Sequence, residues 1–204
     1  MKLFIILFLS LNINIYAQEG NLKNEALTNI NFMTEDYPPF NYFYDGKVSG
    51  FGVDIIVQVF NELKVDKNEK NIRILPWARG YRNVQKMGKR NALFLMGRTI
   101  QRENLFKWVG PVPGNKYVIV TYKNGPKVKK IEDLKKEKVV AIRKDIGGHA
   151  LIDKGFPKKQ LEEVSQADQL FTLIKKRRFK FFSYGLVGLK EKMKASGFEM
   201  ADFE

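Results

Sequence analysis

The chain has 204 residues, of which 44% are hydrophobic and 28% charged, and it contains no cysteine. This composition is typical of a globular protein, and the lack of cysteine excludes disulfides, thiolate metal sites and an acylated cysteine anchor. The formal net charge is +14, but the lysines are dispersed along the chain, which favours a solvated basic surface over a nucleic-acid interface and biases a cleft toward anions.

The N-terminus has the pattern of a secretory signal. Lys2 precedes an apolar run at residues 3–11, a polar stretch at 12–16 and the small residue Ala17. The apolar run is too short to span a bilayer, and no later stretch is long and apolar enough to do so. We therefore expect residues 1–17 to be a signal peptide cleaved after Ala17, and the protein to be periplasmic without a membrane anchor. The remainder has the length of one domain or of two small lobes.

Strand and helix patterns alternate in the first half of the chain. Residues 29–34 and 71–75 have the pattern of short strands, residues 92–96 are a continuous apolar run of strand length, and residues 78–86 have a helical pattern. Apolar residues at helical spacing after Gly52 predict another helix. This alternation predicts a parallel α/β sheet with right-handed crossovers.

Residues 108–114 interrupt the alternation with two prolines and two glycines. They indicate a boundary between lobe 1 at residues 18–113 and lobe 2 at 114–204, with a hinge at 111–116. Ser165 and Asp168 have the spacing of a capping box before a helix that follows residue 166. The strands predicted for lobe 2 are at 139–143, 161–164 and 178–184, and an apolar run lies at 117–121. Helices are predicted at 131–135 and 185–196, and a further helix follows a turn at 145–148 and ends at 154.

A loop of aromatic residues and prolines follows the first strand. Residues 37–42 read YPPFNY, and residues 50–54 read GFGVD just before a helix. Proline fixes φ and lacks a backbone donor, so the strand ends here and Tyr37 and Phe40 stand on a rigid loop at its carboxyl end. Ligands bind at that edge in open α/β sheets. This order of elements resembles the family 3 extracellular solute-binding proteins, the periplasmic receptors that deliver amino acids and similar small polar solutes to ABC importers.

The resemblance covers roughly residues 28–204 and implies a fold of two lobes, each a mostly parallel sheet flanked by helices. It also implies a ligand site. Thr99 and Arg102 match the family's Thr-x-x-Arg, whose arginine clamps the ligand α-carboxylate with a guanidinium fork. The alternative for Arg102 is a surface pair with Glu103.

Aromatic and cationic residues near the same strand ends are further candidates. Trp77 matches the position where the family stacks an aromatic ring on the ligand, and Tyr37 matches the tyrosine of the first loop. Core packing is the alternative for Trp77 and the favoured interpretation for Trp108. Arg79 and Arg98 are extra cations that either line the cleft or are solvated.

The second lobe is expected to contribute a strand-to-helix loop. Residues 140–147 resemble the loop from which the family offers backbone N–H groups to the ligand carboxylate, and a helix N-terminus suits an anion. Asp145, Ile146 and Gly147 are its candidate contacts, but Asp145 and Ile146 replace Ser and Thr. The acidic residue that grips an α-ammonium in the family is matched by Gly185. A ligand with an anionic group and a sugar-like or ring-stacking face is therefore an alternative to a standard α-amino acid.

The sequence thus predicts a protein that captures a small anionic or amino-acid-like solute between two lobes for an ABC importer. It contains one histidine, His149, no Gly-x-Ser-x-Gly, no phosphate loop and no metal-binding spacing, so neither an enzyme nor a cofactor is expected. The alternatives are a sensory or degenerate module uncoupled from transport and, less favoured, an enzyme on the same fold. Family members continue with a strand and helices that return to lobe 1, so we expect a truncated C-terminus and an unpaired edge in the second sheet.

Overall fold

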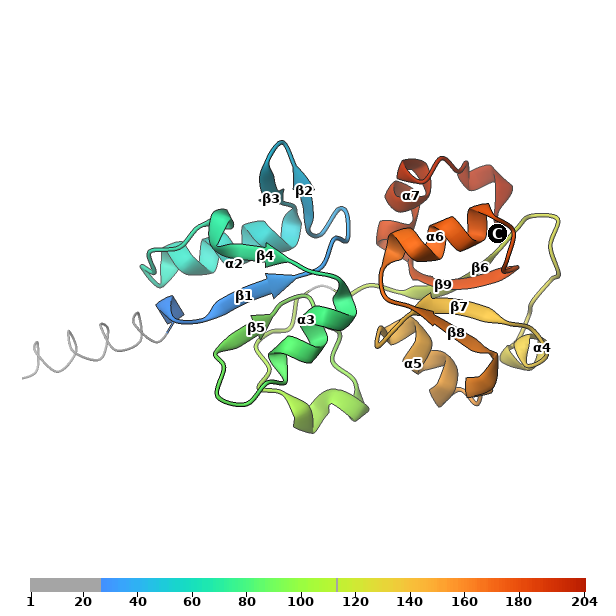
Figure 1. Cartoon of the computed structure of the whole chain (residues 1–204), viewed down its shortest axis with the longest axis horizontal. Coiled ribbons are helices and arrows are strands. Elements are labelled where there is room, and N and C mark those ends of the chain that lie inside the picture. Colours follow the sequence, from blue (N-terminus) through green and yellow to red (C-terminus); the bar gives the residue numbers. More distant parts are fainter. Residues whose placement is uncertain (1–26, 113) are drawn as a thin grey trace, which may run out of the picture.

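The structure is a computed structural model that describes residues 27–112 and 114–204. The predicted signal peptide, residues 1–17, lies outside the described residues. Two sheets with their flanking helices lie end to end along the molecule and are joined by an extended connection (Figure 1). None of the helices in the described ranges has the length and apolarity needed to cross a membrane.

The first sheet is parallel and has the strand order β4-β1-β5. Phe32 to Thr34 are buried in β1, because α2 and α3 cover this central strand. The Phe32 ring meets Phe60 of α2 edge-on at 4.8 Å, as the apolar spacing of this helix predicts. The elements of this half are β1 (Asn31–Thr34), β2 (Tyr42–Tyr44), β3 (Lys47–Ser49), α2 (Phe51–Glu62), η1 (Glu69–Asn71), β4 (Ile72–Ile74), α3 (Trp77–Val84), β5 (Asn91–Leu93) and η2 (Ile100–Leu105).

The second sheet has the order β6-β9-β7-β8, in which β7 is parallel to both neighbours and β6 is antiparallel to β9. Every residue of β7 is buried, which is typical of a central strand covered on both faces. The elements of this half are β6 (Tyr117–Thr121), α4 (Ile131–Leu134), β7 (Val139–Ile142), α5 (Ile146–Asp153), η3 (Lys158–Gln160), β8 (Leu161–Val164), α6 (Ala167–Lys175), β9 (Phe181–Gly185), α7 (Leu186–Ala195) and η4 (Met200–Asp202). The predicted fold class, two mostly parallel α/β sheets flanked by helices, is confirmed.

Some local predictions are wrong. The turn predicted at 145–148 is the first turn of α5, because the Asp145 side chain caps that helix at Ile146 N. The predicted capping box before α6 does not form: Ser165 donates from N and Oγ to Gln169 Oε1, at 3.0 and 2.9 Å, and Asp168 pairs with Lys192 instead. The β2–β3 hairpin was not predicted, since Tyr42 and its neighbours were assigned only to the loop.

Residues 202–204 lie beside the β6 edge of the second sheet. Thr121 and Glu204 exchange two backbone hydrogen bonds of 2.9 Å, and the rings of Tyr122 and Phe203 stack at 4.7 Å. The β6 edge is therefore paired along this stretch, whereas β8 forms the other edge and has no further strand neighbour in the described part of the chain.

The chain passes from the first sheet to the second between β5 and β6. The predicted lobe boundary at residues 113 and 114 falls inside this connection and stays a prediction. Since β1, β4, β5 and β7 present their carboxyl ends toward the space between the sheets, the loops that follow them meet there (Figure 1).

Candidate functional site

A cavity of about 530 Å³ lies between the two sheets, within the usual size range of small-molecule sites. Glu35 and Tyr37 enter it directly after β1, Trp77 after β4, and residues 95–98 after β5. Asp145 enters it from the other sheet, after β7. The cavity thus occupies the carboxyl edge of the strands, where ligands bind in open α/β sheets.

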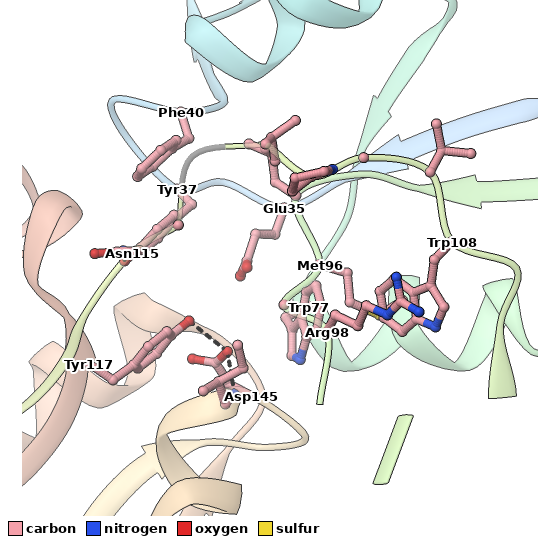
Figure 2. A pocket seen from close by; sticks show the side chains of 18 residues that line it. Glu35, Tyr37, Phe40, Trp77, Met96, Arg98, Trp108, Asn115, Tyr117 and Asp145 are labelled. Atoms are coloured by element: carbon pink, nitrogen blue, oxygen red, sulfur yellow. Dashed lines mark hydrogen bonds between the residues drawn. The ribbon is translucent and has the colours of Figure 1, made fainter. Parts of the chain in front are cut away.

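The loop after β1 is held by its own hydrogen bonds. Asn41 Nδ2 donates to Glu35 O at 2.6 Å, and the Tyr37 amide donates to Asn41 O at 2.6 Å. Asn41 is itself buried. Because these hydrogen bonds hold both ends of the loop, the side chains of Glu35 and Tyr37 are fixed near the carboxyl end of β1. Both project into the cavity (Figure 2).

Two carboxyl groups face the cavity from opposite sheets (Figure 2). Asp145 Oδ1 accepts hydrogen bonds from Tyr117 OH at 2.8 Å and from Ile146 N at 2.7 Å. The Glu35 carboxyl has no hydrogen-bond or ion-pair partner among residues 27–112 and 114–204.

Burial raises the pKa of both carboxyl groups, and that of Glu35 lies well above its usual range. The nearby charges of Asp145 and then Asp36 raise the pKa of Glu35 further, while the Arg102 guanidinium lowers it. For Asp145, the hydrogen bonds from Tyr117 and Ile146 and the charge of Arg102 oppose the effect of burial. No cluster of His, Cys, Asp and Glu suited to a metal ion occurs in the described part of the chain.

Aromatic side chains form much of the remaining wall. The Tyr37 and Phe40 rings are parallel, with centroids 5.6 Å apart. Tyr37 OH accepts a hydrogen bond of 2.7 Å from Asn115 Nδ2, and burial raises the pKa of Tyr37. Trp108 is half-buried and lines the cavity, so the favoured interpretation of Trp108 as a core residue is wrong.

Arg102 is fully buried beside the cavity but does not line it. Its Nη1 donates to Gly97 O at 2.8 Å and its Nη2 to Lys144 O at 2.6 Å. The guanidinium lies over the rings of Trp77 and Tyr81, at 5.5 and 5.2 Å from their centroids. Its two terminal nitrogens are therefore engaged by carbonyl groups of the protein itself.

Glu103, which was the alternative partner for Arg102, pairs with Arg98 instead. The Arg98 guanidinium makes a bidentate pair with Glu103, with Nε donating to Oε2 at 2.7 Å, and it lies 5.7 Å from the Trp108 ring centroid. Both members of the pair are exposed, and Arg98 reaches the rim of the cavity.

The structure separates the residues predicted for the site into two groups. Arg79 is exposed on α3, Thr99 precedes η2 with a buried and unpartnered Oγ1, and Gly147 packs against Ser183. These three and Arg102 lie outside the cavity lining. The predicted residues that line the cavity are Tyr37, Phe40, Trp77, Arg98, Asp145 and Ile146.

Several lining residues were not predicted. Glu35 could have been predicted from the sequence, because it stands between the end of the first strand and Tyr37, at the same sheet edge. Asn115 and Tyr117 had no such signal, since they stand in the connection and at the start of β6, and only the meeting of the two sheets brings them to the cavity.

Contacts between the two halves surround the cavity. Trp77 Nε1 donates to Lys144 O at 2.7 Å, alongside the bond from Arg102. Buried Lys192 of α7 lies 3.2 Å from an Asp36 carboxylate oxygen. A Cβ added to Gly97 would lie only 1.8 Å from Ile146 Cδ1, so the loop after β5 and the first turn of α5 are in direct contact.

No protein-family model matches this sequence, and no curated protein matches it in sequence. Solved structures do match it in fold. An ancestral arginine-binding protein bound to arginine is 19% identical, with a TM-score of 0.69 over 86% of this chain and 77% of the other. The arginine-, lysine-, histidine-binding protein ArtJ from Geobacillus stearothermophilus is 16% identical, with a TM-score of 0.71 over 86% and 73%. A histidine kinase sensor domain similar to periplasmic binding proteins is 17% identical, with a TM-score of 0.74 over 86% and 74%. The chain therefore has the two-lobed fold of the periplasmic solute-binding proteins.

Proposed function

We propose that this protein is a receptor that reversibly binds a small, amino-acid-like solute in the cavity between its two sheets. The observation that carries the proposal is the composition of that cavity, where the carboxyl groups of Glu35 and Asp145 face an aromatic wall at the strand ends of both sheets. The fold shared with the arginine-binding proteins supports a solute of this size and polarity.

The proposed setting is the periplasm, and the proposed partner is the membrane component of an ABC importer. The signal pattern of residues 1–17 and the resemblance to the family 3 receptors support both. Hinge motion in residues 111–116 would open the cavity to the solute, because this range lies in the connection between the two sheets, and Pro111, Val112, Gly114 and Asn115 also line the site.

A sensory module is the second candidate, favoured by the likeness to the histidine kinase sensor domain. Uptake of a labelled solute separates the two functions. Deletion of the gene abolishes uptake if the protein serves an importer, whereas it leaves uptake intact and removes a transcriptional response to the solute if the protein is a sensor.

Binding itself is tested by a thermal-shift screen of the purified protein with amino acids, amines, small peptides, sugars and carboxylates, followed by isothermal titration calorimetry. A solute present at about one hundred times its Kd adds about 2.7 kcal/mol to the free energy of unfolding, which a melting curve detects. A receptor also returns its solute unchanged, so the bound material is extracted and analysed by mass spectrometry. Failure of the whole screen contradicts the proposal, and conversion of the solute favours an enzyme.

A further inference from the structure

The charged groups around the cavity favour one class of ligand. We infer that the site selects a solute with an ammonium or guanidinium group, held by the carboxyl groups of Glu35 and Asp145, and that Arg102 does not grip a ligand carboxylate. This inference rests on the proposed function and specifies the chemistry of the same site.

The ionisable groups at the cavity include more acidic than basic side chains. Glu35 and Asp145 bring two carboxyl groups to the cavity, and Arg102 is the cation whose field reaches both. Arg98 is committed to Glu103 at the rim. With both carboxyl groups ionised, one negative charge remains, and a monovalent cation on the ligand neutralises it.

The other titratable groups near the carboxyl pair add no uncompensated positive charge. Asp36, whose charge also acts on Glu35, shares the ammonium group of Lys192 on α7 with Asp168. Tyr37, Tyr117 and Tyr184 surround the pair, and burial raises the pKa of each phenol. They therefore stay neutral near neutral pH.

Carboxylate oxygens at the cavity remain free to accept hydrogen bonds. Asp145 uses Oδ1 for both of its hydrogen bonds, to Tyr117 and Ile146. Within the described ranges, Asp145 Oδ2 and both carboxylate oxygens of Glu35 make no hydrogen bond. Ammonium and guanidinium groups carry several N–H donors and no acceptor, so they complement this set. The nearby faces of Tyr37 and Phe40 also favour a cation.

The two anion sites that the sequence suggested are poorly placed for a ligand carboxylate. Arg102 is fully buried and does not line the cavity, and each of its terminal nitrogens donates to a protein carbonyl group, that of Gly97 or Lys144. At the N-terminus of α5, the Asp145 carboxylate already accepts the Ile146 amide at 2.7 Å. A ligand carboxylate at this helix end would meet the negative charge of Asp145.

The test compares matched probes by isothermal titration calorimetry. Arginine and lysine are the zwitterions, agmatine and putrescine carry cations without a carboxylate, glutarate is the anionic probe and glucose the neutral one. We expect the cationic probes to bind, agmatine to keep an affinity within about tenfold of that of arginine, and glutarate to show no heat of binding.

The matched variants are Glu35→Gln and Asp145→Asn, which keep side-chain shape and, at residue 145, the ability to cap α5. Each should weaken binding of the cationic probes about 10- to 100-fold, since a charge-assisted hydrogen bond is lost. Glu62→Gln, which removes an exposed carboxylate on α2, is the control and should bind like the unmodified protein. Circular dichroism and the Tm of each variant verify folding.

The outcomes separate this inference from the proposed function. Binding of glutarate, loss of affinity when the carboxylate of arginine is removed, or unchanged affinity in both Glu35→Gln and Asp145→Asn leaves the protein a receptor but overturns the cation assignment. Absence of binding by every probe here and in the wider screen overturns both.

Discussion

Glu35 lies where a buried strand meets the cavity. Its backbone continues a buried parallel strand, while its carboxyl group faces a cavity without a partner in the described part of the chain. Burial and the neighbouring carboxylates of Asp145 and Asp36 raise its pKa well above 4.5. A cationic ligand would favour the ionised form of this group, so ligand affinity should rise with pH as Glu35 ionises.

The same group predicts a pH dependence of stability. Below the unfolded-state pKa, near 4.5, Glu35 is protonated in both the folded and the unfolded state, so it does not lower the free energy of unfolding. Stability is lost as pH rises through the raised folded-state pKa, because the folded state then holds a buried charge. We expect the free energy of unfolding to fall less for Glu35→Gln than for the unmodified protein as the pH rises from 4.5 through the raised folded-state pKa of Glu35.

Urea unfolding at a series of pH values measures this difference, with Glu62→Gln as the control. Part of the slope should remain in Glu35→Gln, because the pKa of Asp145 is raised as well. Parallel curves for Glu35→Gln and the unmodified protein would show that residue 35 does not carry a raised pKa.

At the scale of elements, close packing between the loop after β1 and helix α7 positions Tyr37. A Cβ added to Gly188 on α7 would lie 2.7 Å from Pro38 O and 3.0 Å from the Tyr37 ring, and one added to Gly185 would lie 1.9 Å from Tyr37 OH. The absence of side chains at these two positions lets the loop of one half lie on the helix of the other.

This contact predicts the effect of Gly188→Ala. Alanine has a higher helix propensity than glycine by about 1 kcal/mol, but here the backbone oxygen of Pro38 stands in the way of the new methyl group. We expect a net loss of about 1–3 kcal/mol, typical of overpacking, measured by urea unfolding.

Gly148→Ala on α5 is the matched control, because its Cβ would meet Leu161 at 3.4 Å, an ordinary contact. It should leave stability unchanged or raise it by up to about 1 kcal/mol. A Gly188→Ala protein as stable as Gly148→Ala would mean that the loop after β1 moves freely away from α7.

For the whole molecule, the carbonyl group of Lys144 joins the two halves. It follows β7 in the second sheet and accepts hydrogen bonds from Trp77 and Arg102, which belong to the first half. Arg102, expected from the sequence to clamp a ligand, thus contacts the opposite lobe through this carbonyl.

Arg102→Ala should therefore lower stability whether or not a ligand is present. The change removes two hydrogen bonds and leaves Gly97 O without its partner, so we expect a loss of about 2–4 kcal/mol and a larger radius of gyration as the halves separate. Urea unfolding and small-angle X-ray scattering measure the two effects.

Arg98→Ala removes the same charge from an exposed pair and should cost at most about 1 kcal/mol, without a change in radius of gyration. Equal stability and equal dimensions in the two variants would contradict the role of Arg102 as a contact between the halves.

Local chemistry made much of the fold predictable. The prolines at 38 and 39 prevent β1, which ends at Thr34, from extending through the loop that follows it. The apolar spacing at Val53 and Phe60 orients α2 independently of the second sheet. The order of strands and helices followed from such signals, as did the candidates Tyr37, Phe40 and Trp77, which stand at strand ends that the sequence already marks.

The charges of the site were decided by contacts between residues distant in the chain. Arg102 reaches the carbonyl of Lys144, 42 residues away, and Asp145 meets Tyr117, 28 residues away. Sequence patterns report the neighbours within one helix turn or one strand, whereas side-chain hydrogen bonds depend on how two separately folded sheets face each other. The sequence by itself therefore determined most of the elements and the sheet edge that bears the cavity. Only the tertiary structure decided that Arg102 binds the protein and that two carboxyl groups face the cavity.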